Sequence, residues 1–172
     1  MPRTATASAG SAFSQRVQSW PKPSKHSSSF AAAPPILLWI DDFRLGLDMY
    51  KAMLEMQGFR VLTANSGSQG IRMALWNKFD LVITDYEMPG LNGEVVASAI
   101  KTLYPEMPVL LFSGSAVVST RCRQIVDAVC DKAQSRSELL AAIHFLLHKK
   151  RSHSLQSPIA WRASEHADRT VA

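Results

Sequence analysis

Residues 81–93 read LVITDYEMPGLNG, and this stretch decides the fold of the chain. Residues 81–84 are apolar or β-branched throughout, which is typical of a strand covered on both faces of a sheet. Asp85 follows the strand directly, and Met88-Pro89-Gly90 then has the composition of a turn. Ligands of open parallel α/β sheets bind beyond the carboxyl ends of the strands, so Asp85 is a candidate for chemistry.

Four further apolar runs flank this strand in the sequence. We expect strands at Ile36–Ile40, Arg60–Ala64, Leu81–Thr84, Val109–Phe112 and Ala128–Cys130. The segments between these runs have helical periodicity. Five strands that alternate with helices predict one α/β domain over residues 35–150, built on a doubly wound five-stranded parallel sheet with helices on both faces.

The predicted helices carry start and stop signals. Ser66 with Gln69, and Ser135 with Glu138, have the spacing of a capping box, in which each side chain satisfies the other residue's backbone N–H. A further helix over residues 94–104 is closed by a proline, and another is expected within residues 116–126. The sequence therefore predicts where most of the helices begin.

The first predicted helix has an apolar stripe that should face the sheet. Leu47, Tyr50 and Leu54 form the stripe, and Gly58 is placed to end the helix. Three methionines widen the same stripe: Met49, Met53 and Met56. We therefore expect the methionines on the buried side of this helix.

The charges lie mainly outside the predicted domain. The chain has 172 residues with 19 Lys plus Arg against 14 Asp plus Glu, but residues 34–150 contain twelve of each sign. A neutral domain with basic ends argues against a nucleic-acid-binding face. Residues 1–34 are basic and rich in Ser and Ala, so we expect a disordered extension, with an organelle transit peptide as the alternative. Residues 151–172 are expected to form a flexible tail.

The apolar runs are too short for a membrane-spanning helix, which needs about 18 residues or more. Two cysteines, Cys122 and Cys130, lie eight residues apart without a zinc-ligand spacing. These features predict a cytoplasmic protein with reduced thiols and no membrane segment.

Side chains that can take part in chemistry follow four of the five predicted strands. Asp41 and Asp42 follow the first, Asp85 the third and Ser113 the fourth, and the fifth leads to Lys132. Three carboxylates that converge would repel one another and raise their pKa values unless a cation lay between them. A hard divalent ion with oxygen ligands, most plausibly Mg²⁺, fits this set. Lys132 and the Ser113 hydroxyl would then complete a site for a phosphoryl oxygen, which makes one carboxylate a candidate nucleophile.

These residues resemble the receiver domain of two-component response regulators. The resemblance covers roughly residues 35–150 and rests on four stretches in order: residues 36–42, the Asp-x-x-Met-Pro-Gly-x-x-Gly pattern in residues 85–93, residues 110–114 and Asp131-Lys132. It implies a flavodoxin-like sheet with strand order 2-1-3-4-5.

The resemblance also implies a role in phosphoryl transfer for each candidate site residue. Asp85 looks like the phosphoacceptor, taking its phosphoryl group from a phosphohistidine on a sensor histidine kinase or a histidine phosphotransfer protein. Asp42 and Asp85 would ligate Mg²⁺ together with the backbone carbonyl of Glu87, and Asp41 would act through bound water. Ser113 would be the switch hydroxyl. Such a protein is a phosphoacceptor and not an enzyme in the usual sense.

Two positions depart from the family pattern. Val129 stands where the family carries a switch aromatic, three residues before Lys132. Ala133 stands where the family has a proline after a cis bond, and a cis bond before Ala would cost about 2.5–4 kcal/mol, so we expect a trans peptide. These departures leave open a second reading, a phosphorylation-independent adaptor whose switch is degenerate. An aspartate-nucleophile hydrolase is disfavoured because Glu87 replaces the second Asp of those enzymes.

The 22 residues after residue 150 are too few for a DNA-binding output module, so we expect a stand-alone, single-domain regulator. Its output would be binding of a downstream protein, which the sequence does not identify. The expected face combines the helix within residues 116–126, the last strand and the last helix, near Arg121, Arg123, Leu139, Ile143 and Leu147. The sequence leaves open whether the domain forms a homodimer.

Overall fold

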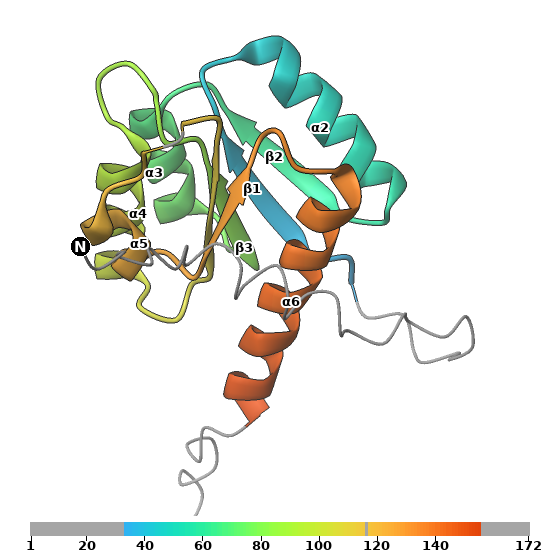
Figure 1. Cartoon of the computed structure of the whole chain (residues 1–172). Coiled ribbons are helices and arrows are strands. Elements are labelled where there is room, and N and C mark those ends of the chain that lie inside the picture. The colour runs from blue at the N-terminus through green and yellow to red at the C-terminus, as the bar shows by residue number, and fades with distance from the viewer. Residues whose placement is uncertain (1–32, 116, 156–172) are drawn as a thin grey trace, which may run out of the picture.

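The computed structural model describes residues 33–115 and 117–155. Its centre is a five-stranded parallel sheet in the order β2-β1-β3-β4-β5, as expected (Figure 1). The strands are β1 (Ile36–Ile40), β2 (Arg60–Ala64), β3 (Leu81–Thr84), β4 (Val109–Ser113) and β5 (Ala128–Asp131). The first three have the predicted bounds, and the last two are each one residue longer than predicted. The predicted extension, except residues 33 and 34, lies outside the described residues.

Five helices connect and follow the strands. They are α2 (Arg44–Met56), α3 (Gly67–Trp76), α4 (Gly93–Leu103), α5 (Thr120–Ile125) and α6 (Arg136–Leu155). The α5 helix lies inside the range expected for it. The α6 helix continues to Leu155, past the predicted domain end at residue 150, and the rest of the predicted tail lies outside the described residues. No helix in residues 33–115 and 117–155 is long and apolar enough to cross a membrane.

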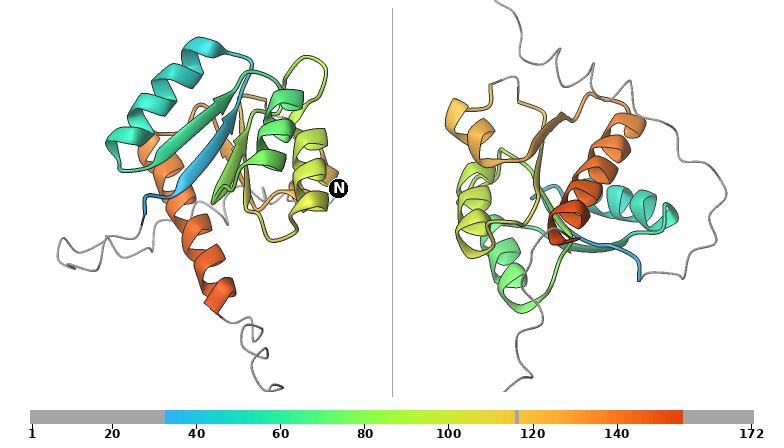
Figure 2. Two further views of the ribbon diagram at one scale, coloured as in Figure 1. Left: turned by 180° about the vertical axis from the view of Figure 1, so that it is seen from behind. Right: turned by 90° about the horizontal axis from the view of Figure 1, so that it is seen from below.

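Helices cover both faces of the sheet. This double cover explains why the sequence of β1 is apolar throughout. Leu37 and Trp39 belong to the core beneath α2 and α6, whereas Leu38 and Ile40 belong to the core beneath α3, α4 and α5. Figure 2 shows the two helical layers on opposite sides of the sheet. Because successive side chains of a strand point to opposite faces, an uninterrupted apolar run requires this double cover.

The predicted caps are present. At α3 only half of the predicted capping box forms: the Ser66 hydroxyl accepts the backbone N–H of Gln69 at 3.3 Å, but the Gln69 side chain accepts the N–H of Asn65, at 2.9 Å, instead of that of Ser66. At the start of α6 the exchange is reciprocal, because Ser135 Oγ accepts the N–H of Glu138 at 3.3 Å while the Glu138 carboxylate accepts the N–H of Ser135 at 2.9 Å. Gly58 follows α2 with φ +87°, a left-handed conformation that suits glycine at a helix end.

One expectation about α2 is wrong. Leu47 and Leu54 are buried and Tyr50 and Met53 are partly buried, but Met49 is 47% exposed and Met56 is 85% exposed. The sheet accepts only one side of the helix, and the two outer methionines lie beyond that side. The widened stripe is therefore two surfaces, one facing the core and one facing outward.

The prediction of the output face is also wrong in part. Leu139, Ile143 and Leu147 of α6 are buried in the core, so they are not available to a partner. Arg121 and Arg123 of α5 are exposed. The surface that remains beside α5 is mixed: Arg121 lies 3.6 Å from Glu94 of α4, and both line a pocket together with the exposed apolar side chains of Val95 and Leu103.

Candidate functional site

Three carboxylates meet at the carboxyl ends of β1 and β3. These strands are neighbours, and the N–H of Asp85 donates to the carbonyl of Ile40 at 2.8 Å. Asp41, Asp42 and Asp85 each bring a carboxylate oxygen within 4.8 Å of the others. Asp41 and Asp85 are buried, whereas Asp42 is exposed. The sheet therefore brings together the acidic residues that the sequence singled out, and it leaves one of them open to solvent.

Lys132 reaches this cluster from the end of β5. Its Nζ donates to Asp41 Oδ2 at 2.9 Å and lies 3.2 Å from Asp85 Oδ1. Its backbone N–H donates to the Ser113 carbonyl at 2.9 Å, which fixes where the side chain starts. No described residue has a cis peptide bond, so the bond to Ala133 is trans as expected. The replacement of proline by alanine does not keep Lys132 from the carboxylates.

The pKa values of Asp85 and Lys132 are both shifted by burial and by the charges around them. Burial is the main cause that raises the pKa of Asp85, and Asp41 raises it further, while the nearby Lys132 ammonium opposes both. Burial alone would lower the pKa of Lys132, but its hydrogen bond to Asp41 and the charges of both carboxylates raise it overall. The ammonium is thus held in its charged form while Asp85 retains a tendency to protonate.

Ser113 lies at the end of β4, between β3 and β5 in the sheet. Its side chain is buried, and its hydroxyl oxygen accepts the N–H of Ser115 at 3.0 Å. The hydroxyl proton remains available to another acceptor. Glu87, two residues after Asp85, is exposed.

The two glycines of residues 85–93 have different structural roles. Gly90 has φ +80°, which forms the turn after Met88-Pro89. Gly93 starts α4, and a Cβ atom there would collide with the backbone carbonyl of Asp85. The N–H of Gly93 also donates to the Tyr86 carbonyl at 2.9 Å. Gly93 therefore lets α4 begin directly against the backbone of the candidate phosphoacceptor.

Sequence reasoning missed an aromatic cluster beside the site. Trp39 stacks on Tyr50 of α2 with ring centroids 4.7 Å apart, and the Phe112 ring meets both edge-on at 5.3 and 5.1 Å. Lys132 Nζ lies 5.9 Å from the centre of the Phe112 ring. The Trp39 indole N–H is buried without a hydrogen-bond partner among the described residues. Val129 is partly buried on the other side of the sheet, so the cluster does not replace the missing aromatic in position.

The donor set suits a hard divalent cation. All three converging side chains offer carboxylate oxygens, which Mg²⁺ prefers, and the described residues place no histidine or cysteine with them. One ammonium leaves three acidic groups undercompensated, so an added cation would relieve their repulsion. The exposed position of Asp42 gives the ion a route from solvent.

Comparisons with known proteins agree with this geometry. The family model described as "Response regulator receiver domain" matches residues 37–144, more than half of the chain. A receiver domain protein from Clostridium thermocellum is 30% identical, with TM-score 0.65, over 69% of this chain and 98% of that chain. The Thermotoga maritima response regulator TrrA, solved in complex with Mg²⁺-BeF, is 26% identical with TM-score 0.63, over 65% of this chain and 98% of that one.

Among curated proteins, the cell cycle transcriptional regulator CtrA of Caulobacter vibrioides is 24% identical over 121 residues. This match covers 69% of this chain and 52% of that protein. The chain thus spans about half the length of the curated relatives that it matches.

Proposed function

This chain belongs to the receiver domain family of response regulators, and on that premise we propose that Asp85 accepts a phosphoryl group in a two-component pathway. The donor is a phosphohistidine on a sensor histidine kinase or a histidine phosphotransfer protein. The observation that carries the proposal is the position of Asp85, a buried carboxylate at a strand end that contacts Lys132 and lies beside two further aspartates.

The transfer makes one bond and breaks one. An oxygen of Asp85 attacks phosphorus, the P–N bond to the donor imidazole breaks, and the imidazole keeps the electron pair and takes up a proton. Lys132 lies within reach of the product's phosphoryl oxygens because its Nζ already lies 3.2 Å from Asp85. The Ser113 hydroxyl is proposed to donate to another phosphoryl oxygen.

Mg²⁺ is proposed to bind the oxygens of Asp42 and Asp85 and the backbone carbonyl of Glu87, with Asp41 acting through water. Bound there, the ion supplies positive charge to the phosphoryl oxygens as they pass between donor and acceptor. The residues of the chain hold Asp85 in place and exclude water from its buried side. The domain then acts as a phosphoacceptor whose product is a changed surface, without repeated turnover of a substrate.

For the output we propose binding of a downstream protein by the receiver surface itself. Every described helix and strand belongs to this one domain. We propose the cytoplasm as its location, where ATP is available to the histidine kinase that would supply the phosphoryl group. The curated relatives are about twice as long as their matched part.

A second candidate is a phosphorylation-independent adaptor with the same fold. Val129 favours it, since no aromatic ring occupies the position at which the family couples the site to its output face. The two candidates differ at one step, the incorporation of phosphorus at Asp85.

The deciding experiment is intact mass spectrometry after incubation of the full chain with acetyl phosphate and Mg²⁺. We expect the mass of one phosphoryl group to be added, and we expect it to disappear in Asp85→Asn and without Mg²⁺. Asp131→Asn is the matched control, because Asp131 is an exposed carboxylate at the neighbouring end of β5. A folded, Mg²⁺-saturated protein that gains no mass would favour the adaptor.

A further inference from the structure

The start of α5 is held by side chains from two neighbouring segments. Ser119, the residue that caps α5, donates its N–H to the Tyr86 hydroxyl at 3.4 Å and its hydroxyl proton to the Glu94 carboxylate at 2.5 Å. Its Oγ also accepts the N–H of Cys122 at 2.9 Å. The hydrogen bonds to Tyr86 and Glu94, the Ser119 contacts, join the cap of α5 to the loop after β3 and to α4.

Both partners of Ser119 are themselves fixed beside Asp85. Tyr86 follows Asp85 directly, and its N–H donates to Asp85 Oδ1 at 2.7 Å. Glu94 follows Gly93, which packs so closely on the Asp85 carbonyl that a Cβ atom there would collide with it. The Ser119 contacts therefore connect α5 to Asp85 along two short paths.

The position of α5 depends on these contacts because the helix is short and lightly packed. It has six residues, and within it only Cys122 is buried. A helix this short is not stable alone and keeps its place through its cap and its tertiary contacts. Of the described helices, α5 should therefore respond most to a change at its first residues.

Tyr86 lies on the side of the sheet where the family aromatic is missing. Tyr86 and Val129 are both partly buried against the core beneath α3, α4 and α5, whereas Trp39 and Phe112 belong to the other core. Tyr86 thus brings an aromatic ring and a hydroxyl to the start of α5, from the end of β3 instead of from β5.

A further connection runs along the chain from Ser113. Five residues separate Ser113 from Ser119. Ser113 Oγ accepts the N–H of Ser115 at 3.0 Å, and in the described part of the chain it forms no hydrogen bond with Asp85 or Lys132. Turning this hydroxyl toward a phosphoryl oxygen would change its bond to Ser115, and the short connection would pass the change on toward Ser119.

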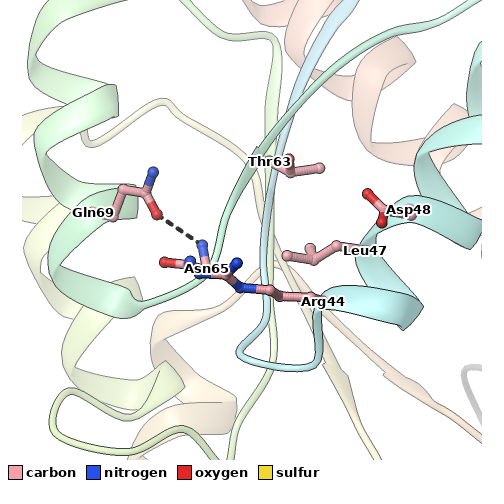
Figure 3. A pocket seen from close by; sticks show the side chains of 6 residues that line it. All are labelled: Arg44, Leu47, Asp48, Thr63, Asn65 and Gln69. Carbon is pink, nitrogen blue, oxygen red and sulfur yellow. Dashed lines mark hydrogen bonds between the residues drawn. The ribbon is translucent and has the colours of Figure 1, made fainter.

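The start of α2 has no comparable connection. It lies two residues after Asp42, beside a pocket of about 290 Å³ (Figure 3). The hydrogen bond drawn there joins the Gln69 side chain to the N–H of Asn65, just before α3. Among the described residues that line the pocket, no hydrogen bond joins α2 to β2. A change at the site therefore has a hydrogen-bonded path to α5 that this side lacks.

Phosphorylation would act on both paths to Ser119. An Asp85 carboxylate that becomes an acyl phosphate loses its charge, which weakens the bond that it accepts from the Tyr86 N–H. At the same time the Ser113 hydroxyl would be drawn to the phosphoryl group. The bond between Ser119 and the Tyr86 hydroxyl is already longer than the usual 2.7–3.2 Å, so a small displacement breaks it.

We propose that the Ser119 contacts couple Asp85 to α5: they hold the helix while Asp85 is unmodified and open when it carries a phosphoryl group. This coupling rests on the proposed function, because it describes how the state of Asp85 is passed on. Opening releases Glu94, which also lies 3.6 Å from Arg121. Both line a pocket of about 570 Å³ at α4 and α5, so the change reaches the surface there.

The test is the affinity of the full chain for beryllium fluoride, which mimics a phosphoryl group on a carboxylate, measured by calorimetry at saturating Mg²⁺. If binding has to open the Ser119 contacts, their removal in advance makes binding tighter. We expect Tyr86→Phe to raise the affinity about threefold and Ser119→Ala about tenfold, since the second bond goes to a charged group. Damage to the domain would lower the affinity instead.

The matched controls are Tyr104→Phe and Ser66→Ala, which remove the same atoms elsewhere. Tyr104 ends α4, and Ser66 caps α3 through the same kind of bond. Both variants should bind beryllium fluoride as the wild type does. Hydrogen exchange measured by NMR gives a second result: beryllium fluoride should speed exchange of the Ser119 amide in the wild type, and Tyr86→Phe should exchange it fast without the ligand.

Unchanged or weaker binding by Tyr86→Phe and Ser119→Ala would overturn the coupling, as would a Ser119 amide whose exchange does not respond to beryllium fluoride. Labelling by acetyl phosphate, measured in parallel, reports on Asp85 separately. A wild type that is labelled while the variant affinities stay level loses only the coupling. A wild type that takes no label and binds no beryllium fluoride loses the proposed function as well.

Discussion

The Lys132 ammonium lies between two buried carboxylates, 2.9 Å from Asp41 and 3.2 Å from Asp85. One positive charge is therefore shared by two acids, and the exposed Asp42 adds a third negative group to the same cluster. The site is balanced only in part by the protein itself. Its stability should respond both to the loss of the ammonium and to the arrival of a metal ion.

Lys132→Met should lower the melting temperature in the absence of Mg²⁺, because the buried carboxylates lose the one cation that contacts them among the described residues. Added Mg²⁺ should then stabilise the variant more than it stabilises the wild type. Thermal denaturation with and without Mg²⁺ measures both effects. Lys149→Met is the control, since Lys149 is half exposed and lies 3.8 Å from Asp127. Equal Mg²⁺ shifts in Lys132→Met and wild type would contradict the expectation.

Asp42→Asn should leave the metal-free domain as stable as the wild type or more so, because it removes a negative charge from the cluster. It should also remove most of the stabilisation by Mg²⁺, which for a specific site amounts to about 2.7 kcal/mol at a hundred times the dissociation constant. Urea denaturation with and without Mg²⁺ gives the two free energies of unfolding. Retention of the full Mg²⁺ effect would remove Asp42 from the proposed ligands.

Gly93→Ala should lower the free energy of unfolding by several kcal/mol and abolish phosphoryl incorporation, since the new Cβ would displace the backbone carbonyl of Asp85. Gly58→Ala is the comparison. It strains a left-handed position, at φ +87°, where a Cβ would meet no neighbour. It should cost about 1 kcal/mol and leave incorporation unchanged. Normal incorporation in Gly93→Ala would show that the Asp85 backbone can move freely.

Lys150→Met should destabilise the domain by about 1–3 kcal/mol. The Lys150 Nζ donates to the carbonyl of Phe79 at 2.8 Å and to that of Asp80 at 3.3 Å, which joins the far end of α6 to the start of β3. Lys149→Met is the control, because the neighbouring Lys149 side chain is half exposed. It should change the free energy of unfolding little. Chemical denaturation of both variants tests this, and equal losses would mean that the carbonyls find other partners.

Both cysteines should resist thiol reagents in the folded protein. Burial is the main cause that raises the pKa of Cys122 to about 11 and that of Cys130 to about 12. The reactive thiolate therefore remains a minor form up to about pH 9. Reaction with a chromogenic disulfide at pH 8 should be slow for the native chain and fast for both thiols in denaturant. Rapid labelling of either cysteine in the native protein would indicate local opening.

Much of the fold could be predicted from local patterns. Strand bounds were predicted within one residue because both faces of the sheet are covered and several of the runs are apolar throughout. The caps at Ser66 and Ser135 were predicted because both partners lie within four residues of sequence, although only the box at Ser135 is reciprocal. The convergence of Asp41, Asp85 and Lys132 was predictable because parallel strands end at one edge.

The remaining features depend on how elements are rotated and packed. α2 has apolar residues on two sides, so periodicity alone could not tell that Met56 faces outward while Leu54 faces the core. The ring cluster joins Trp39 and Tyr50, from the consecutive elements β1 and α2, to Phe112 of β4, which lies much further along the chain. No local signal marks such a contact.

That cluster gives the domain an optical probe of its own. Trp39 lies two residues before Asp41 and stacks on Tyr50, while Phe112 lies beside Ser113 and under Lys132. The fluorescence of a shielded indole is sensitive to charges nearby, so the binding of an ion or a phosphoryl group would change its emission. With Trp20, Trp76 and Trp161 replaced by phenylalanine, one chromophore would follow occupancy of the site in real time and without an attached dye.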